Sequence, residues 1–222
     1  MTFRAVLFDL DGTLLDTLED LADSTNLALR RLGLPEHPAE AYKHFIGDGI
    51  DNLARRAVPE DRRDPATLAE CVELTRENYA ARWAEKTQPY EGIPDLLDAL
   101  TMRGIPMAVF SNKPDDFARL CVERLLAGWH FEVVLGAGAT LPKKPDPAGA
   151  EWIARHFQLA PAEIVYLGDT DTDMQTAVAA GMFPVGALWG FRDAEELLAS
   201  GARVLIRQPL DLLPLLDAAP AL

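Results

Sequence analysis

Residues 3–13 read FRAVLFDLDGT, and this stretch decides the fold because it joins a buried strand to a pair of acids. An apolar run of this length that ends at an acid is typical of a strand inside a parallel sheet. Gly12 then permits a tight turn, so that Asp9 and Asp11 could face one pocket. There one carboxylate could attack a substrate while the other transfers a proton. An ordinary turn is the alternative interpretation, because Asp and Gly are common in turns.

Similar apolar runs recur along the chain and alternate with helical patterns. The runs lie at residues 106–110, 131–135 and 163–167, with weaker ones at 183–188 and 202–206. The helical patterns lie at residues 95–103, 114–126, 147–157 and 173–181. Strands that alternate with helices indicate βαβ units. We therefore predict an α/β fold with a Rossmann-like parallel sheet and helices on both faces.

The stretch from residue 16 to about residue 85 interrupts this alternation. It contains no strand-like run, and its helical patterns lie at residues 17–32, 40–45, 51–58 and 67–83. We expect residues 16–85 to form an inserted all-helical domain. Residues 1–15 and 86–222 would then form the Rossmann-like catalytic core, with hinges near Asp16 and residues 88–92.

Composition and charge restrict the possible partners. The 222 residues are 49% hydrophobic and 25% charged, with a formal net charge of −14. This is the composition of a globular protein, and its negative charge argues against binding to nucleic acid or to anionic membranes. A phosphate ester would be repelled as well. The pocket for an anionic substrate therefore needs a local cation.

The sequence also predicts where the protein acts. No uncharged apolar stretch of about 18 residues occurs, so we expect no transmembrane helix. Asp9 and Asp11 interrupt the apolar N-terminus, which therefore lacks the core of a signal peptide. The two cysteines, Cys71 and Cys121, form no CxxC pair and fit a reducing compartment. We expect a cytoplasmic protein with no membrane partner.

Three further polar clusters follow predicted strands, where ligands bind in open parallel sheets. Ser111-Asn112-Lys113 could hold a phosphate through its hydroxyl and backbone N–H groups, or it could simply begin a helix. Lys144 could balance phosphate charge, or it could lie in a solvated loop. Residues 168–173 read GDTDTD, and acids at that density are costly unless a cation such as Mg²⁺ lies among them.

Taken together and in order, these clusters resemble the four motifs of the haloacid dehalogenase superfamily. The matching residues are Asp9-x-Asp11-Gly12-Thr13, Ser111, Lys144 and Gly168-Asp169-x-x-x-Asp173. A helical block inserted after the first motif resembles the subclass with a helical cap domain. Within that subclass the chain is most similar to the phosphoglycolate phosphatases. That similarity rests on Ile46-Gly47-Asp48-Gly49, Pro89-Tyr90-Glu91-Gly92, Ser111-Asn112-Lys113-Pro114 and Trp189-Gly190.

The resemblance implies a role for each of the core residues. Asp9 is expected to be the nucleophile that forms an aspartyl-phosphate, and Asp11 the acid that protonates the leaving group and then activates water. Mg²⁺ is the expected cofactor, held by Asp9, the Asp11 backbone carbonyl and Asp169, with Asp173 in support. Ser111 would grip the phosphoryl oxygens, and Lys144 would offset their charge. Four more residues are expected to bind phosphate or substrate: Thr13, Asn112, Gly47 and Gly49.

The implied activity is magnesium-dependent hydrolysis of a small phosphorylated metabolite, with phosphoglycolate as the best candidate. A sugar-phosphate phosphatase or phosphomutase and a pyrophosphatase are alternatives of the same superfamily. A haloacid dehalogenase is disfavoured because that reaction has no use for an acid at Asp11. A non-catalytic binding module would be expected to lose Asp9, Asp11 or Asp169, and all three are present.

The turn at residues 47–49 is the expected contact for the substrate carboxylate. Its backbone N–H groups could meet that carboxylate, with Lys43, His44 or Arg55 as nearby charges. Asp48 is expected to point away, because two facing carboxylates repel each other. We expect the protein to be a monomer or a homodimer.

Overall fold

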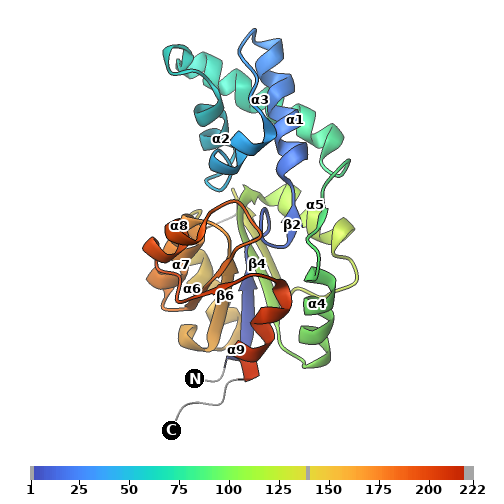
Figure 1. Cartoon of the computed structure of the whole chain (residues 1–222), viewed down its shortest axis with the longest axis vertical. Coiled ribbons are helices and arrows are strands. Elements are labelled where there is room, and N and C mark those ends of the chain that lie inside the picture. Colours follow the sequence, from blue (N-terminus) through green and yellow to red (C-terminus); the bar gives the residue numbers. More distant parts are fainter. Residues whose placement is uncertain (1–2, 139–140, 218–222) are drawn as a thin grey trace. The chain divides into compact units, whose positions relative to one another are not determined.

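The computed structural model describes residues 3–138 and 141–217, which form two compact units (Figure 1). The first, here called the core unit, comprises Met1–Leu15 and Pro89–Leu222. The second, here called the helical unit, comprises Asp16–Gln88. Two short strands, β2 (Leu15–Asp16) and β3 (Gln88–Pro89), pair with each other where the chain leaves and re-enters the core unit. The helical unit is therefore an insertion whose two ends are neighbours.

The core unit is built on a parallel sheet. In the described part of the chain this sheet has six strands in the order β5-β4-β1-β6-β7-β8, and every neighbouring pair is parallel. The strands are β1 (Ala5–Phe8), β4 (Met107–Pro114), β5 (Val133–Ala137), β6 (Ile164–Gly168), β7 (Phe183–Ala187) and β8 (Val204–Ile206). All four residues of β1 are buried, as its apolar sequence predicts for a central strand.

Helices cover both faces of this sheet, which confirms the predicted α/β fold. They are α4 (Ile93–Met102), α5 (Asp115–Leu125), α6 (Ala148–Phe157), α7 (Asp171–Ala180), α8 (Ala194–Ala199) and α9 (Leu213–Asp217), with 3₁₀ turns at Pro161–Glu163 and Pro209–Leu212. Successive strand residues point to opposite faces. On one face, Leu7 and Tyr166 pack with Ile153 of α6 and Ala177 of α7. Figure 1 shows α4 on the other side of the sheet, where right-handed crossovers would also place α5.

The structure differs from the sequence-based expectation at strand β4. We expected the strand to end at Phe110, but it continues to Pro114 with an irregular register between these two residues. The physical reason is that β5 runs on beside it, so that Pro114 pairs with Ala137. Ser111, Asn112 and Lys113 therefore lie in the irregular end of a strand and not in a separate loop.

The helical unit contains three α-helices and two 3₁₀ helices within the described residues. They are α1 (Leu18–Arg31), a 3₁₀ helix at Ala39–His44, α2 (Ile50–Ala57), a 3₁₀ helix at Glu60–Arg62, and α3 (Pro65–Arg82). Asp64 caps α3 by accepting hydrogen bonds from Ala66 N and Thr67 N, and proline follows at the first helical position. Leu29, Ala54 and Leu74 belong to the apolar cluster that joins the helices.

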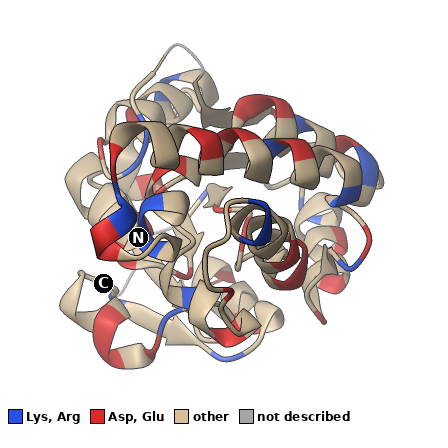
Figure 2. Cartoon of the chain, turned by 90° about the horizontal axis from the view of Figure 1, so that it is seen from above, with Lys and Arg blue, Asp and Glu red and all other residues tan. Residues whose placement is uncertain are grey.

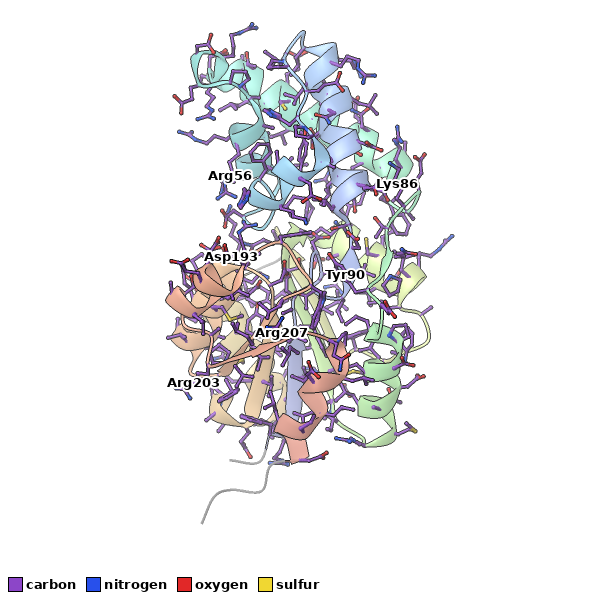
Figure 3. All side chains as sticks on the ribbon, in the orientation of Figure 1. Arg56, Lys86, Tyr90, Asp193, Arg203 and Arg207 are labelled. Atoms are coloured by element: carbon purple, nitrogen blue, oxygen red, sulfur yellow. The ribbon has the colours of Figure 1, made fainter. Side chains whose placement is uncertain are left out.

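Charged residues of both signs are spread over the helices, with acidic ones in excess (Figure 2). Within the helical unit, Lys86 (Figure 3) forms ion pairs with Glu19 and Asp23 on α1. Cys71 and Cys121 are both buried, and neither forms a disulfide. None of the helices in the described part of the chain has the length and hydropathy that a membrane crossing needs.

Candidate active site

Asp9 lies at the carboxyl end of β1, in the middle of the sheet. Its backbone N–H donates to the Leu167 carbonyl of β6 at 2.9 Å, and its side chain is buried. The chain turns back directly afterwards, and Gly12 N–H donates to the Leu15 carbonyl. Gly12 has φ +89°, and any Cβ there would collide with the Asp169 carboxylate. Only glycine therefore allows this turn to pass so close to the acid.

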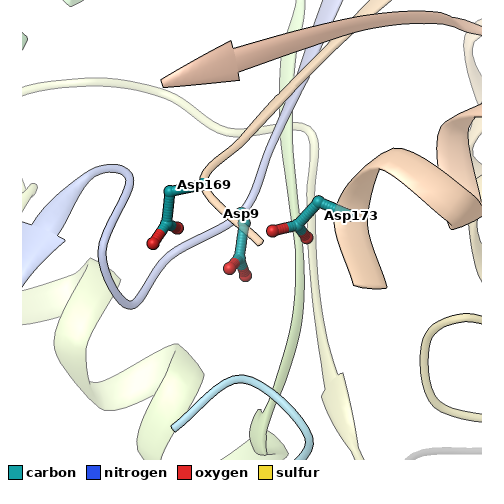
Figure 4. Close-up of side chains that lie close together, drawn as sticks. All are labelled: Asp9, Asp169 and Asp173. Carbon is teal, nitrogen blue, oxygen red and sulfur yellow. The ribbon is translucent and has the colours of Figure 1, made fainter. Parts of the chain in front are cut away.

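Three buried carboxylates meet at this end of the sheet (Figure 4). Asp169 follows β6, and Asp173 lies in the first turn of α7. One oxygen from each, and one from Asp9, all lie within 4.8 Å of one another. We expected the helix to begin at Asp173, but α7 begins at Asp171 because Thr170 and Asp173 form a capping box.

The crowding of these acids shifts their pKa values. Burial and the charge of Asp173 raise the pKa of Asp9 to about 7, although Lys144 acts in the opposite direction. Burial, with the charges of Asp173 and Asp9, raises the pKa of Asp169 well above its usual range. Both shifts mean that burial, together with the neighbouring acids, disfavours the charged form of Asp9 and Asp169. A cation bound beside these carboxylates would favour their charged form.

Lys144 is the buried cation of the cluster. Its Nζ lies 2.6 Å from Asp173 Oδ1 and 2.8 Å from Asp9 Oδ1. Burial would lower the pKa of Lys144, but Asp173 and Asp9 outweigh it and hold that pKa well above its usual range. Asn112 fixes the backbone here, because its Nδ2 donates to the Lys144 carbonyl at 3.0 Å and its Oδ1 accepts from Lys144 N–H at 2.8 Å. The amide that we expected to bind phosphate thus holds Lys144 in place.

Asp11 forms a second buried ion pair. Lys113 Nζ donates to Asp11 Oδ1 at 2.8 Å, and the two side chains are only 3% and 12% exposed. Ser111, two residues earlier on β4, is buried, and its Oγ accepts from Lys113 N–H at 3.3 Å. The core motifs therefore supply two lysines, one directed to Asp9 and the other to Asp11.

Asp173 and Asp169 differ in how many hydrogen bonds their carboxylates accept. A carboxylate has about four acceptor positions. Asp173 accepts from Lys144, Tyr166 and twice from Thr170. Asp169 accepts only from Thr13 Oγ1 at 2.7 Å and Phe191 N–H at 2.8 Å among the described residues. Asp169 therefore keeps acceptor positions for a cation, and an all-oxygen site of this kind fits a hard divalent cation.

The sequence of the chain matches the family of haloacid dehalogenase-like hydrolases over residues 6–187. The chain belongs to this family. The expectation of a hydrolytic enzyme of the haloacid dehalogenase type is thereby confirmed, and the order of the motifs along the chain is what carried it.

Relatives of this hydrolase cover nearly its whole length. It is 35% identical over 216 residues to the phosphoglycolate phosphatase of Pseudomonas putida. This alignment covers 95% of this chain and 79% of that protein. It is 32% identical over 232 residues to the phosphoglycolate phosphatase of Escherichia coli K12, at 96% and 92% coverage. A crystal structure from Lactobacillus delbrueckii subsp. bulgaricus superposes with a TM-score of 0.90 at 29% identity, covering 97% of this chain and 99% of that one.

Gly47 and Gly49 belong to the helical unit of this hydrolase. Both have positive φ, +122° and +87°, and Gly49 immediately precedes α2. Between them, the Asp48 carboxylate accepts from the guanidinium of Arg56 (Figure 3). Lys43, one of the charges expected near this turn, pairs with Glu40 at 2.8 Å. The turn is thus held by one ionic contact inside the helical unit, that of Asp48 with Arg56.

Four contacts at the active site of this hydrolase were missed by the sequence analysis. Trp189 Nε1 donates to the Thr13 carbonyl at 3.0 Å, and Phe191 N–H donates to Asp169. A Cβ at Gly190 would collide with Asp169. The Trp189-Gly190 pair was noticed only as a family resemblance, and a backbone donor such as Phe191 leaves no signal in residue type. The fourth contact, Lys113 with Asp11, was missed because the two residues lie far apart in the chain.

The core unit also has a surface hollow that shares Trp189 with the contacts just described. It has a volume of about 520 Å³ and is lined by Trp189 and by parts of residues 90–95 and 207–210. None of the predicted site residues lines it. We look for the chemistry at the carboxyl ends of β1, β4 and β6, because the buried carboxylates and the lysines that pair with them are gathered there.

Proposed function

We propose that this hydrolase is a Mg²⁺-dependent phosphatase that acts on a small phosphorylated metabolite through Asp9. The observation that carries the proposal is the group around Asp9: a buried carboxylate at the end of the central strand, with Lys144 at 2.8 Å and Asp169 beside it. A phosphate monoester is dianionic, so a nucleophilic carboxylate can approach it only where cations offset the charge. Mg²⁺ would be held by Asp9, the Asp11 carbonyl and Asp169, with Asp173 in support, and would supply that charge.

The reaction proceeds in two displacements. An oxygen of Asp9 attacks phosphorus, the ester P–O bond breaks, and Asp11 gives its proton to the leaving alkoxide. A water then transfers a proton to Asp11 as its oxygen attacks phosphorus, which releases Asp9 and inorganic phosphate. Ser111 and the N–H groups after Asp9 bind the phosphoryl oxygens, and Lys144 balances their charge. Splitting the reaction in this way replaces weakly nucleophilic water by a carboxylate in the first step.

Phosphoglycolate is the substrate that we propose. Two relatives of at least 30% identity, from Pseudomonas putida and Escherichia coli, carry the name phosphoglycolate phosphatase. We propose that residues 16–85 form a helical cap domain and that residues 1–15 and 86–222 form the catalytic core. In this cap the Gly47–Gly49 turn would read the glycolate carboxylate. We place the enzyme in the cytoplasm, because its two cysteines are buried thiols without a disulfide and therefore fit a reducing compartment. We propose that it is a monomer or a homodimer.

A substrate screen tests this function. The purified chain is incubated with phosphoglycolate, sugar phosphates, pyrophosphate and other small phosphorylated metabolites, with Mg²⁺ or with excess chelator, and inorganic phosphate is measured. We expect release that requires Mg²⁺, with phosphoglycolate among the best substrates. A clear preference for a sugar phosphate or pyrophosphate would replace the substrate but keep the phosphatase. Release from none of the compounds would contradict the phosphatase itself.

A further inference from the structure

Lys113 is a buried cation to which the mechanism above gives no task. Its ammonium group donates to Asp11 at 2.8 Å, and only 3% of its side chain is exposed. The other lysine of the site, Lys144, is directed to Asp9 and Asp173. A buried ammonium group is costly unless it is paired. The pair with Asp11 is therefore a specific contact and not a chance meeting of surface charges.

The backbone that carries Lys113 is well anchored. It lies in the irregular end of β4, and Gly136 of β5 packs directly against it. A Cβ at Gly136 would come within 2.8 Å of the Lys113 carbonyl oxygen. Lys113 N–H also donates to Ser111 Oγ. The sheet thus fixes the backbone of Lys113, from which the side chain reaches Asp11.

Asp11, unlike Lys113, does not lie in a strand of the sheet but in the turn after β1. Among the described residues its carboxylate has one hydrogen-bond donor, Lys113. A carboxyl group in a turn can rotate about its side-chain bonds, and a general acid works only when its proton points at the leaving oxygen. Misplacement of a reacting group by about 1 Å can cost on the order of 10²-fold in rate. The direction of Asp11 therefore depends on its partner.

We propose that Lys113 is a positioning residue that sets the direction of the Asp11 carboxyl group for proton transfer to the leaving group. The proposal rests on the function proposed above, because it needs Asp11 to act as the acid. It assigns the two lysines separate tasks. Lys144 balances charge at the nucleophile, and Lys113 aims the acid.

Two substrates with different leaving groups can distinguish a role of Lys113 in proton transfer from a general effect on the active site. An alkoxide is a strongly basic leaving group and needs a proton from Asp11, whereas p-nitrophenolate is weakly basic and leaves without one. The value of kcat/KM reports the steps up to the aspartyl-phosphate and excludes its hydrolysis, which is common to both substrates. A misdirected Asp11 should therefore lower kcat/KM for an alkyl phosphate and spare that for p-nitrophenyl phosphate.

The experiment measures kcat/KM for p-nitrophenyl phosphate and for the alkyl phosphate that the wild type hydrolyses fastest. We expect Lys113→Met to lower the alkyl value at least about tenfold more than the aryl value, and Lys113→Arg to recover part of the loss. Lys86→Met is the matched control, because Lys86 pairs with exposed acids of α1, and it should leave the ratio unchanged. Circular dichroism checks that each variant is folded.

A double-mutant cycle then tests whether Lys113 acts through Asp11. In an Asp11→Asn background, Lys113→Met should cause little additional loss with the alkyl phosphate. Equal losses for both substrates, no loss, or an undiminished loss in the Asp11→Asn background would each overturn the positioning role. A wild type that hydrolyses no phosphate ester would overturn the proposed function, and that result is seen before any variant is measured.

Discussion

Asp9 is the residue on which the proposed chemistry depends, and a substitution there should remove activity without unfolding the protein. Asn has nearly the same shape but no charge and a much weaker nucleophile, so Asp9→Asn should lower kcat by roughly 10⁴-fold or more, as in other sites whose residues act together. The same change removes one buried negative charge beside Asp173, so the melting temperature should not fall. Kinetics and a thermal melt of the variant measure both effects.

Asp171→Asn is the control variant for Asp9→Asn. Asp171→Asn changes an acid close in sequence that is not part of the carboxylate cluster, and it should keep near-normal activity. If Asp9→Asn also kept near-normal activity, the nucleophile would have to be another residue. A folded, inactive Asp9→Asn protein is the expected outcome.

At the residue scale, the sequence predicted residue types well and their partners poorly. Asp9 and Asp11 could be found because an apolar run points to them locally. The bonds of Asn112 to Lys144 span 32 positions in the chain, and the pair of Lys113 with Asp11 spans 102. Such contacts depend on which strands become neighbours. A single sequence does not contain that information in any local pattern.

At the level of elements, the same limit appears in β4 and α7. The apolar core of each element was predicted from its periodicity, because burial dictates residue type there. The irregular register between Phe110 and Pro114 depends on the length of β5 beside it. The start of α7 at Asp171 depends on the reciprocal bonds between Thr170 and Asp173. Both features alter the polar ends of elements, which is where the site lies.

The turn after β1 gives the prediction at this scale. In Gly12→Ala, a positive φ costs about 1–3 kcal/mol, and the new Cβ must also displace the Asp169 carboxylate. We expect activity to fall by about 10²-fold and the melting temperature to fall. Gly104→Ala is the matched control, since Gly104 also has positive φ, +63°, but has open space around it.

The comparison of these two alanine variants isolates the contact with Asp169. Gly104→Ala should lose some stability and keep its activity. Steady-state kinetics and thermal melts of both variants are the measurements. If Gly12→Ala behaved like Gly104→Ala in both respects, the close approach of the turn to Asp169 would have no catalytic importance.

For the molecule as a whole, the buried acids predict that Mg²⁺ stabilises the fold. A ligand that binds only the folded state adds about 2.7 kcal/mol when its concentration is 100 times Kd. In a chain of this size, 1 kcal/mol raises the melting temperature by roughly 2–4 °C. We therefore expect Mg²⁺ at that concentration to raise it by about 5–10 °C. Asp169→Asn should abolish the shift, and Asp171→Asn should keep it.

Calcium provides a second test of the same site. Ca²⁺ accepts more oxygen ligands than Mg²⁺ and can occupy the second oxygen of a nucleophilic carboxylate. It should therefore also raise the melting temperature, while suppressing phosphate release in competition with Mg²⁺. Full activity after exhaustive chelation, or equal thermal shifts in Asp169→Asn and wild type, would show that the metal site is assigned wrongly.

Substrate choice involves both units in the proposed function, because the core unit binds the phosphate and the helical unit recognises the rest of the substrate. If the turn of Gly47 and Gly49 reads the glycolate carboxylate, Gly47→Ala and Gly49→Ala should lower kcat/KM for phosphoglycolate more than for an aryl phosphate. Both positions have positive φ, so alanine would distort the N–H groups that the turn presents. An aryl phosphate lacks the carboxylate and needs only the phosphate contacts of the core unit. Gly33→Ala is the matched control, since Gly33 lies in the same unit with φ +67° and open space around it. That variant should leave the ratio of the two kcat/KM values unchanged, and equal losses for both substrates in the Gly47 and Gly49 variants would remove this turn from substrate recognition.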